Sequence, residues 1–518
     1  MTKVLITDPI DQTGIDILSQ VAQVDQRIGI SNSELASIIK DYDALMIRSG
    51  TQVTEEIINS SNKLRIIGRA GVGVDNVDVK AATQKGVLVV NSPGGNTIAA
   101  AEHTIAMMLT LSRHIPIANM STFLGKWERK KFVGNELYKK KLGVVGLGKI
   151  GAHVAKVANA LGMEVYGYDP FVSTERAQQI QVKLSELEDL FQQSDYVTLH
   201  LPRTPETENL VNMEVLKSMK SSAKLINCAR GGLIDEEALA EALNKSLIAG
   251  AAIDVFSKEP LESNSPLLKV EKNLILTPHL GASTEEAQEN VAIQVAEQMS
   301  NYLSNGAITN ALNIPSISAE DAPKLKPYIK LCEQIGKLAG QITETSIKNI
   351  KIEFGGQVAL LNTKPLISVL VAGLLSHSME AVNVVNAPVI AKNRNMNITS
   401  SIREKTGDYI TDISLTVETE RRTRNVVGTL YGNQPRIVEV MNTRIEAELG
   451  PNMLFITNED KPGFIGSLGS ILADAKINIA TFHLGRTKVG GDAIALIEID
   501  EAVSKELIET LNLSLIHI

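Results

Sequence analysis

Two series of alternating strand-like and helix-like segments run along the first half of the chain, and no other feature limits its fold as strongly. Runs of β-branched and aliphatic residues come first at 3–7, 43–49, 64–70 and 86–91, with helix-like stretches at 31–40 and 54–60. A second series begins at 142–148 and continues through the runs MEVYGYD, YVTLHLP, AKLINCA, AGAAIDVF and NLILTPH. Strands separated by helices form parallel βαβ units with right-handed crossovers. We therefore expect an α/β protein with two parallel sheets.

Length and composition describe a globular protein of several domains. A chain of 518 residues is too long for one hydrophobic core, and we expect it to divide into about three or four domains. The net charge of -8 leaves no basic excess with which to neutralise nucleic-acid phosphates. Two cysteines cannot form a disulfide framework, and no run reaches the roughly 18 apolar residues that span a bilayer. These properties predict a soluble cytoplasmic protein without nucleic-acid or membrane partners.

A glycine-rich motif opens the second series. Gly146, Gly148 and Gly151 form a G-x-G-x-x-G pattern between a strand-like run and a helix-like stretch, and Asp169 ends the next strand. In this context the first glycine permits a tight turn, the second lets the backbone approach a pyrophosphate, and the third allows close helix–strand packing. The helix N-terminus offers N–H groups to the phosphates. Asp169 would bind the ribose hydroxyls and repel a 2′-phosphate, so the motif predicts NAD rather than NADP.

Three polar residues follow strand-like runs further along the chain. Arg230, Glu259 and His279 lie in the segments NCARGGLID, AAIDVFSKEP and TPHLGAS. Open α/β sheets bind ligands beyond the carboxyl ends of their strands. Oxidation of a hydroxy acid needs a base for the hydroxyl proton, a carboxylate to orient that base, and a guanidinium for the substrate carboxylate or keto oxygen. Taken singly, these residues could equally be a loop histidine, a surface charge and a salt-bridge partner.

Five motifs in one order decide between these interpretations. The segments GLGKIG, YDP, CARGGLIDEEAL, AAIDVF with the following EP, and PHLGASTEEAQ all fall within residues 146–288. This ordered set closely resembles the D-isomer-specific 2-hydroxyacid dehydrogenases. Within that family, the chain is similar to the long members that oxidise D-3-phosphoglycerate with NAD, the first step of phosphorylated L-serine biosynthesis.

The resemblance implies a division of the chain into four parts. It predicts two Rossmann-like lobes with parallel sheets, an α+β intervening domain and a ferredoxin-like βαββαβ ACT domain. The corresponding ranges are 1–95 with 285–312 for the substrate-binding lobe, 96–284 for the NAD-binding Rossmann domain, 316–448 for the intervening regulatory domain and 452–518 for the ACT domain. The active site would lie in the cleft between the two lobes.

The resemblance also assigns roles to single residues. Arg230, Glu259 and His279 match the family's catalytic residues, and Asp254 matches the residue that contacts the nicotinamide carboxamide. The remaining cofactor-binding positions are Gly146, Gly148, Lys149, Ile150, Gly151, Asp169 and Cys228. Substrate-side positions are Arg48, which matches the residue that reaches the phosphate, with Val72, Gly73 and Asn96. Backbone N–H groups of the loop around Val72 and Gly73 would bind the substrate carboxylate.

Several other charged or titratable side chains have weaker interpretations. The basic cluster Lys126–Lys131 would either add positive charge near the substrate phosphate, from a neighbouring subunit, or form a solvated loop. His103 and His114 lie in an apolar helix-like segment from Asn96 to about Ile117, which favours a structural role. His200 ends a strand and is expected next to the cofactor. We expect no metal ligand set.

The last third of the chain has its own motifs. Residues 452–518 show a strand–helix–strand–strand–helix–strand order with the segment DKPGFIGSLGSIL, which resembles the ACT domain. By that match Asp460, Gly463 and Asn478 would lie near an effector, with L-serine the natural candidate as pathway end product, although many such domains only dimerise. The chain stops after LSLIHI, which leaves the last strand in doubt. In the intervening segment, Asn383 and Arg394 are anion-site candidates.

Three functions are compatible with these features. The first is oxidation of D-3-phosphoglycerate in a homodimer or homotetramer. The second is a sister enzyme that acts on glyoxylate, hydroxypyruvate or D-lactate, against which Arg48 and the two extra domains argue. The third is a NAD-sensing binding protein that works through protein contacts. An intact set of arginine, glutamate and histidine argues against the third, because a sensor needs no base.

Overall fold

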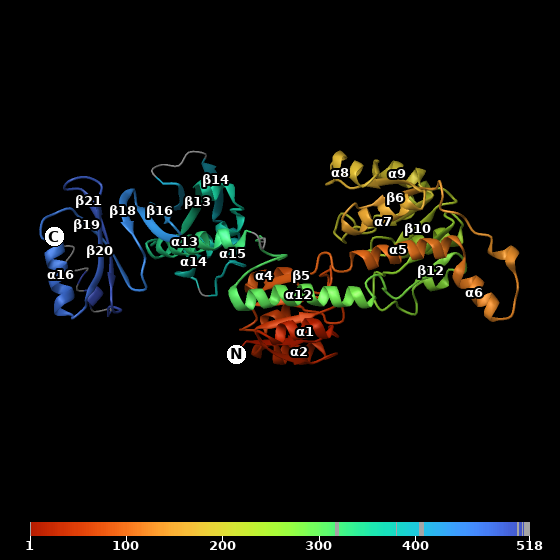
Figure 1. The fold of residues 1–518 in the computed structure, drawn as a ribbon, viewed down its shortest axis with the longest axis horizontal. Coiled ribbons are helices and arrows are strands. Elements are labelled where there is room, and N and C mark those ends of the chain that lie inside the picture. The colour runs from red at the N-terminus through yellow and green to blue at the C-terminus, as the bar shows by residue number, and fades with distance from the viewer. Residues whose placement is uncertain are drawn as a thin grey trace.

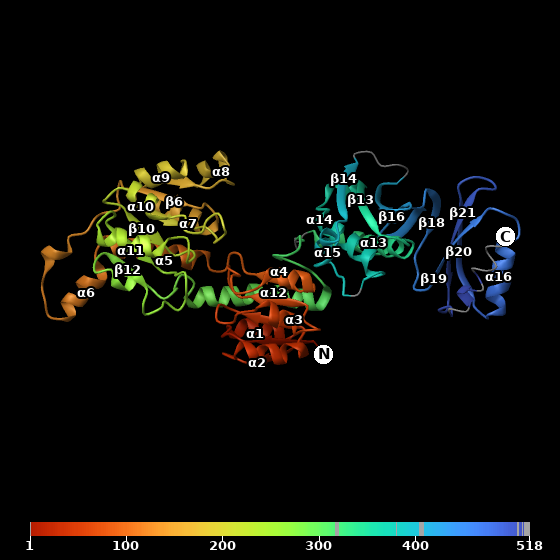
Figure 2. The same cartoon turned by 180° about the vertical axis from the view of Figure 1, so that it is seen from behind.

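The computed structural model describes residues 2–315, 317, 321–379, 381–403, 409–504, 507–509 and 511. Four bodies follow one another along an elongated molecule (Figure 1). Two α/β lobes are joined by long helices, and two smaller α+β bodies extend from them toward the C-terminus, as the reverse view also shows (Figure 2). The predicted fold class, two Rossmann-like lobes followed by an α+β domain and an ACT domain, is confirmed.

The first lobe is built on a five-stranded parallel sheet in the order β2-β1-β3-β4-β5. All four predicted strands are present, and the elements are β1 Lys3–Ile6, α1 Gln12–Ser19, β2 Gln23–Gln26, α2 Asn32–Ile38, β3 Ala44–Ile47, α3 Glu55–Asn59, β4 Ile66–Arg69, α4 Val79–Lys85 and β5 Leu88–Asn91. The edge strand β2 was not predicted. Its sequence QVDQ is mostly polar and no residue in it is fully buried, so it carries no apolar signal.

The second lobe contains a seven-stranded parallel sheet in the order β12-β11-β10-β9-β6-β7-β8. Its strands are β6 Lys141–Val145, β7 Glu164–Tyr168, β8 Lys183–Leu184, β9 Tyr196–Leu199, β10 Lys224–Asn227, β11 Gly250–Ile253 and β12 Leu274–Leu276. Its helices are α7 Lys149–Ala160, α8 Thr174–Gln179, α9 Leu187–Gln193, α10 Met213–Ser218 and α11 Glu236–Asn244. The strand order reverses between β9 and β6, which is the switch point at which open α/β sheets bind ligands.

Two long helices connect the lobes, and each packs against the lobe that it enters. Helix α5 (Thr97–Ser112) leaves the first lobe and packs Ala101, Met108 and Leu111 into the core of the second. Helix α12 (Glu285–Asn305) leaves the second lobe and packs against the first sheet, where Met299 lies so close to Gly68 that a side chain at Gly68 would collide with it. Each lobe therefore depends on a helix that follows the other lobe in the chain.

The helix predicted from Asn96 to about Ile117 was wrong at its C-terminal end. Helix α5 ends at Ser112, His114 adopts a left-handed backbone with φ 54°, and a second helix, α6 (Ile115–Phe123), begins there. Helix α6 and the 3-10 turn η2 (Arg129–Phe132) project from the second lobe as an arm (Figure 1).

The third body packs three helices against a six-stranded mixed sheet in the order β14-β13-β15-β16-β17-β18. The strands are β13 Ile347–Gly356, β14 Asn397–Arg403, β15 Thr411–Thr419, β16 Thr423–Tyr431, β17 Gln434–Val440 and β18 Thr443–Ala447. The helices are α13 Ala322–Gln341, α14 Lys364–Ser376 and α15 Ala387–Asn393.

This third body docks onto the first lobe through one short segment. Asn383 donates from its side-chain amide to the carbonyl of Gly86 at 2.9 Å, and Val385, 2% exposed, belongs to the core of the first lobe. Oδ1 of the same Asn383 side chain accepts the backbone N–H of Val385. The side chain for which the sequence suggested an anion is thus used in the contact between domains.

The C-terminal body contains β19 Met453–Glu459, α16 Phe464–Asp474, β20 Ile479–Arg486 and β21 Asp492–Ile499, with the antiparallel sheet order β19-β21-β20. The doubtful last strand lies outside the described residues. Ile494 and Leu496 of this sheet pack into the core of the third body, which joins the two. None of the described helices is both long and apolar enough to cross a membrane.

Candidate active site

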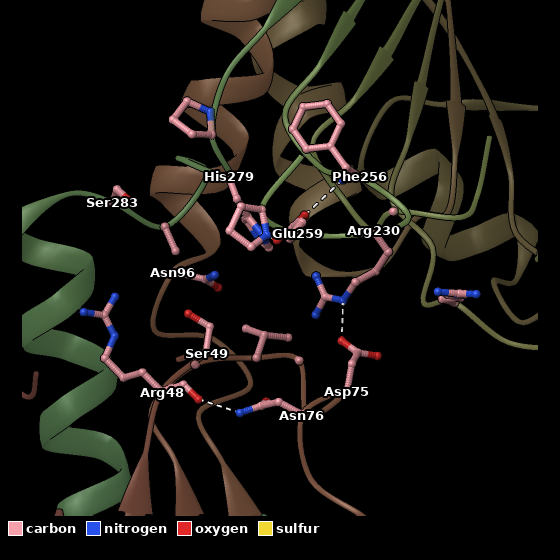
Figure 3. A pocket seen from close by; sticks show the side chains of 18 of the residues that line it. Arg48, Ser49, Asp75, Asn76, Asn96, Arg230, Phe256, Glu259, His279 and Ser283 are labelled. Atoms are coloured by element: carbon pink, nitrogen blue, oxygen red, sulfur yellow. Dashed lines mark hydrogen bonds and ion pairs between the residues drawn. The ribbon is translucent and has the colours of Figure 1, made fainter. Parts of the chain in front are cut away.

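A cleft of about 820 Å³ lies between the two lobes (Figure 3). Its polar lining follows the carboxyl ends of strands from both sheets. Arg48 follows β3 and Arg69 ends β4, while the second lobe contributes Arg230 after β10, Glu259 after β11 and His279 after β12. Two sheets that face each other across the cleft thus bring together residues that are far apart in the sequence, including the three predicted catalytic residues.

His279 and Glu259 form the closest pair in the cleft. Nδ1 of His279 lies 2.7 Å from Oε2 of Glu259, and the other Glu259 oxygen accepts the backbone N–H of Phe256 at 3.0 Å. Burial opposes ionisation of Glu259, but the bonds from His279 and Phe256 outweigh it and hold the pKa of this carboxyl below its usual value. A carboxylate bound to Nδ1 leaves Nε2 as the ring nitrogen that can exchange a proton.

Arg230 crosses the cleft to the first lobe. Its Nε donates to Asp75 at 2.9 Å, and Nη1 donates to the carbonyl of Ala229 at 2.6 Å. Gly73 explains how the guanidinium fits, because a Cβ there would lie 1.9 Å from Nη2 of Arg230. The glycine loop of the first lobe makes room for this arginine as well as lining the cleft beside Val72.

Arg69 is a functional candidate that the sequence reasoning missed. Its Nε is buried and has no hydrogen-bond partner among the described residues, and burial together with the charges of Arg230 and Arg48 lowers its pKa to about 10. Gly71 leaves it space, since a Cβ there would lie 1.6 Å from Nη1 of Arg69. The available signal was its position at the end of a parallel strand, directly before the glycine loop. Arg48, Arg69 and Arg230 place three guanidinium groups along one cleft, which suits an anion.

Asn96 supplies a further unpartnered group. It precedes α5, lines the cleft, and its Oδ1 is buried without a hydrogen-bond partner among the described residues. Arg48 is held only loosely, with Nη1 3.4 Å from Oε1 of Gln288 on α12. Both side chains therefore have hydrogen-bonding capacity to offer a ligand.

The glycine motif forms the turn between β6 and α7. Gly146 has φ 97°, and a Cβ there would lie 2.4 Å from the carbonyl oxygen of His200. A Cβ at Gly151 would lie 2.0 Å from the carbonyl oxygen of Gly146, whereas a Cβ at Gly148 meets nothing within 4 Å. The first and third glycines are therefore required for packing, and the second leaves the backbone open. Lys149 and Ile150 begin α7, whose first turn has no side-chain cap.

Asp169 closes this turn from the next strand. Its carboxylate accepts the backbone N–H of Leu147 at 2.8 Å and that of Phe171 at 2.9 Å. An uncapped helix N-terminus, an open glycine and a carboxylate at the end of the second strand are the parts of a dinucleotide site, so the residues present fit NAD.

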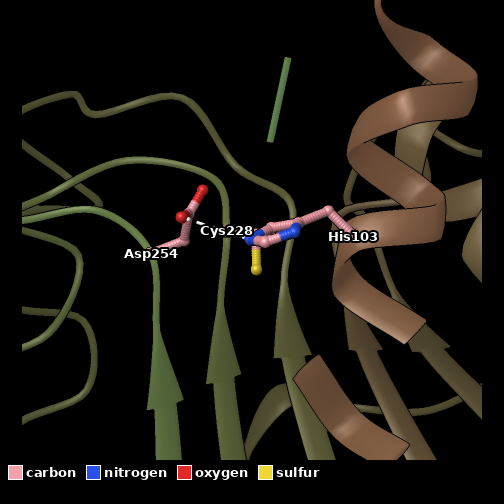
Figure 4. Close-up of side chains that lie close together, drawn as sticks. All are labelled: His103, Cys228 and Asp254. Carbon is pink, nitrogen blue, oxygen red and sulfur yellow. Dashed lines mark ion pairs between the residues drawn. The ribbon is translucent and has the colours of Figure 1, made fainter. Parts of the chain in front are cut away.

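Asp254 and Cys228 lie deeper in the second lobe (Figure 4). Asp254 is fully buried and accepts Thr277 Oγ1 at 2.6 Å, the Leu280 N–H at 2.8 Å and the Gly281 N–H at 2.9 Å. Burial and the charge of Asp254 raise the pKa of Cys228 to about 12, so this side chain is a thiol and a poor nucleophile at neutral pH.

The three predicted effector residues lie at different points of the C-terminal body. Asp460 accepts from Arg486 at 2.7 Å and from the Gly490 N–H at 3.1 Å. Asn478 donates to Asp500 at 2.8 Å, and Gly463 precedes α16 with φ 103°.

The basic cluster Lys126–Lys131 follows α6 within the arm. It is absent from the lining of the cleft in its own chain.

Comparison with known proteins gives consistent matches along the chain. The family model "D-isomer specific 2-hydroxyacid dehydrogenase, NAD binding domain" matches residues 105–281, the D-3-phosphoglycerate dehydrogenase intervening domain matches 324–441, and the ACT domain matches 452–512. A D-3-phosphoglycerate dehydrogenase of Synechocystis is 49% identical over 515 residues, covering 99% of this chain and 93% of the relative. One of Methanocaldococcus jannaschii is 43% identical, covering 99% and 98%.

A solved structure matches about three-fifths of the chain. The D-lactate dehydrogenase of Aquifex aeolicus, complexed with NAD and lactic acid, matches with a TM-score of 0.54 and 26% identity. The match covers 61% of this chain and 100% of that chain.

His200 lies beneath the glycine turn, and its burial should make the stability of the second lobe depend on pH. Burial lowers its pKa to about 4, and Nε2 lies 3.0 Å from Thr198 Oγ1. An unfolded histidine binds a proton below about pH 6.5. The contribution of His200 to stability is therefore complete above that pH and falls as the pH drops toward 4, by about 2.5 kcal/mol at pH 4.5. We expect His200→Gln to reduce the fall in apparent Tm between pH 7 and pH 4.5, measured by calorimetry. Equal falls in both proteins would contradict this role of His200.

Proposed function

The chain belongs to the D-isomer-specific 2-hydroxyacid dehydrogenases, and we propose that it oxidises D-3-phosphoglycerate to 3-phosphohydroxypyruvate with NAD. The main support for this proposal is that one cleft is lined by a histidine–carboxylate pair and three arginines. The pair suits removal of a hydroxyl proton, and the arginines suit a substrate with both a carboxylate and a phosphate. Relatives with this activity match the chain over nearly its full length.

The cofactor would be held by the turn after β6. Gly148 and the uncapped first turn of α7 would receive the pyrophosphate, and Asp169 would bind the ribose hydroxyls. Asp254 would hold the carboxamide side of the nicotinamide, with Cys228 packed beside it. When bound, NAD supplies the acceptor for the hydride that leaves C2 of the substrate.

His279 would take the proton of the C2 hydroxyl on Nε2 as the hydride leaves that carbon. Glu259, already bound to Nδ1, would stabilise the imidazolium that forms. Arg230 would exchange Asp75 for the substrate carboxylate or the developing keto oxygen, since a bidentate contact to a carboxylate is stronger than its single bond to Asp75. Asn96 and the backbone around Val72 and Gly73 would bind the carboxylate from the first lobe.

Arg48 and Arg69 would bind the phosphate. Both lie at the ends of first-lobe strands and line the same cleft as His279, so a three-carbon acid could place its carboxylate at Arg230 and its phosphate on these two guanidinium groups. D-Lactate and glyoxylate have no group for these arginines. The structural relatives named for those substrates match only about three-fifths of this chain.

The arm that contains α6 supports a homodimer or homotetramer. Phe123 is 83% exposed and Trp127 is 80% exposed, next to exposed Leu124 and Met120. A monomer rarely exposes such a continuous apolar surface. A partner chain that covers this arm would receive the basic cluster Lys126–Lys131, which could then add charge near the partner's phosphate site.

We also propose where the protein works and what regulates it. A cytoplasmic location suits a chain with two free cysteines. The ACT domain suits a small-molecule effector, and L-serine is the effector that we propose, near Asp460, Gly463 and Asn478.

Removal of the proposed base tests the activity itself. With NAD and D-3-phosphoglycerate, we expect the wild type to form NADH and His279→Gln to lose about 10²- to 10⁴-fold in kcat with little change in KM. His377→Gln, an exposed histidine of the third body, is the control and should match the wild type. An unchanged kcat in His279→Gln would overturn the mechanism.

Two substitutions test recognition of the phosphate. Arg48→Gln and Arg69→Gln should each lower kcat/KM for D-3-phosphoglycerate by roughly 10- to 100-fold, because a bond to a charged group contributes about 1.5–3 kcal/mol. The slow oxidation of D-glycerate should change little. Arg65→Gln is a matched control in the same lobe, since Arg65 lies against the ring of Tyr302. A similar loss for both substrates would exclude a phosphate-specific role.

Sedimentation velocity tests the proposed oligomer. The double variant Phe123→Ser and Trp127→Ser should sediment as a smaller species than the wild type, because it removes the two most exposed aromatic side chains of the arm. Phe171→Ser, which removes an aromatic side chain that is 95% exposed elsewhere, should not change the assembly. A double variant with the wild-type sedimentation coefficient would show that the arm is not the interface.

A further inference from the structure

His103, Cys228 and Asp254 converge in the second lobe from three separate elements (Figure 4). His103 lies on α5, Cys228 directly follows β10 and Asp254 directly follows β11. One nitrogen, one sulfur and one oxygen of these side chains lie within 4.8 Å of one another, and Nε2 of His103 is 3.2 Å from Oδ1 of Asp254. The three residues come from α5 and from the ends of β10 and β11, so folding of the second lobe brings the cluster together.

The carboxylate of this cluster is held mainly by neutral groups. Asp254 is fully buried, and its hydrogen bonds come from neutral donors: one threonine hydroxyl and two backbone N–H groups. In the described part of the chain, the contact with His103 is the one ion pair found for Asp254, and it requires a protonated imidazole. A buried carboxylate in such surroundings is stabilised by a cation.

The donor types and their spacing suit a thiophilic divalent cation. Imidazole nitrogen, thiolate sulfur and carboxylate oxygen are the ligands of Zn²⁺, with bond lengths of about 2.0–2.3 Å. Tetrahedral coordination at those lengths separates the ligand atoms by about 3.3–3.8 Å. The distance between His103 and Asp254 already matches one such edge, and a separation of at most 4.8 Å for the other pairs is closed by a small rotation of Cys228.

We propose that His103, Cys228 and Asp254 bind Zn²⁺ or a chemically similar ion, and that this ion and NAD exclude each other. Binding forms a metal–sulfur bond and releases the thiol proton to solvent, and any proton shared by His103 and Asp254 also leaves. The fourth position is open to water, as in zinc sites with three protein ligands. The exclusion rests on the proposed function, in which Asp254 holds the nicotinamide carboxamide. The site would make the enzyme sensitive to free zinc.

Cobalt provides a direct readout that needs no catalysis. Co²⁺ takes the place of Zn²⁺ in such sites, and a cobalt–thiolate bond gives a charge-transfer absorption in the near ultraviolet. We expect full-length protein without NAD to show this band, and Cys228→Ser to lose it. Cys332→Ser is the matched control, because Cys332 is buried in the core of the third body and is the only other cysteine. His103→Gln should weaken cobalt binding at least tenfold in equilibrium dialysis.

Each outcome decides a separate point. Absence of the band in the wild type, or its persistence in Cys228→Ser, would overturn the metal site, as would unchanged binding in His103→Gln. If NAD removes the band, exclusion is supported. If NAD binds by calorimetry but leaves the band intact, the exclusion is overturned and the assignment of Asp254 to the nicotinamide is wrong, while the metal site stands.

Discussion

The carboxyl ends of two parallel sheets face each other across one cleft, and the rest of the structure depends on this arrangement. The strands place polar side chains at or just beyond their carboxyl ends, such as Arg69 at the end of β4 or His279 after β12. These side chains meet only because α5 and α12 cross between the lobes and hold the two sheet edges opposite each other. The glycine loop at Gly71 and Gly73 completes the arrangement by leaving space for two guanidinium groups.

This arrangement concentrates positive charge in the cleft. The charges repel one another, and they also provide a site for an anion. Arg69 is buried with an unpartnered Nε, and Arg48 and Arg230 lower its pKa. A doubly or triply charged anion removes this repulsion, which is why the substrate proposed is a phosphorylated acid. Asp75 neutralises Arg230 across the cleft in the same region. Binding of substrate would exchange one carboxylate for another at Arg230.

Much of this could be predicted from the sequence, because the signals are local. The strands, the turn at Gly146–Gly151 and the three residues Arg230, Glu259 and His279 follow from periodicity and ordered motifs. The break at His114 was missed because the apolar pattern continues across it, although Pro116 in the first turn of α6 marks a new helix start. Asn383 could not be predicted to bind Gly86, since no local pattern reports a contact across 297 residues.

We propose that one cleft binds both the carboxylate and the phosphate of a phosphorylated hydroxy acid, while His279 faces the C2 hydroxyl. A crystal structure of His279→Gln with NAD and D-3-phosphoglycerate measures this most directly. We expect the phosphate within hydrogen-bond distance of Arg48 and Arg69, the carboxylate at Arg230 and the hydroxyl at residue 279. A phosphate bound at Arg230, with Arg48 and Arg69 empty, would contradict it.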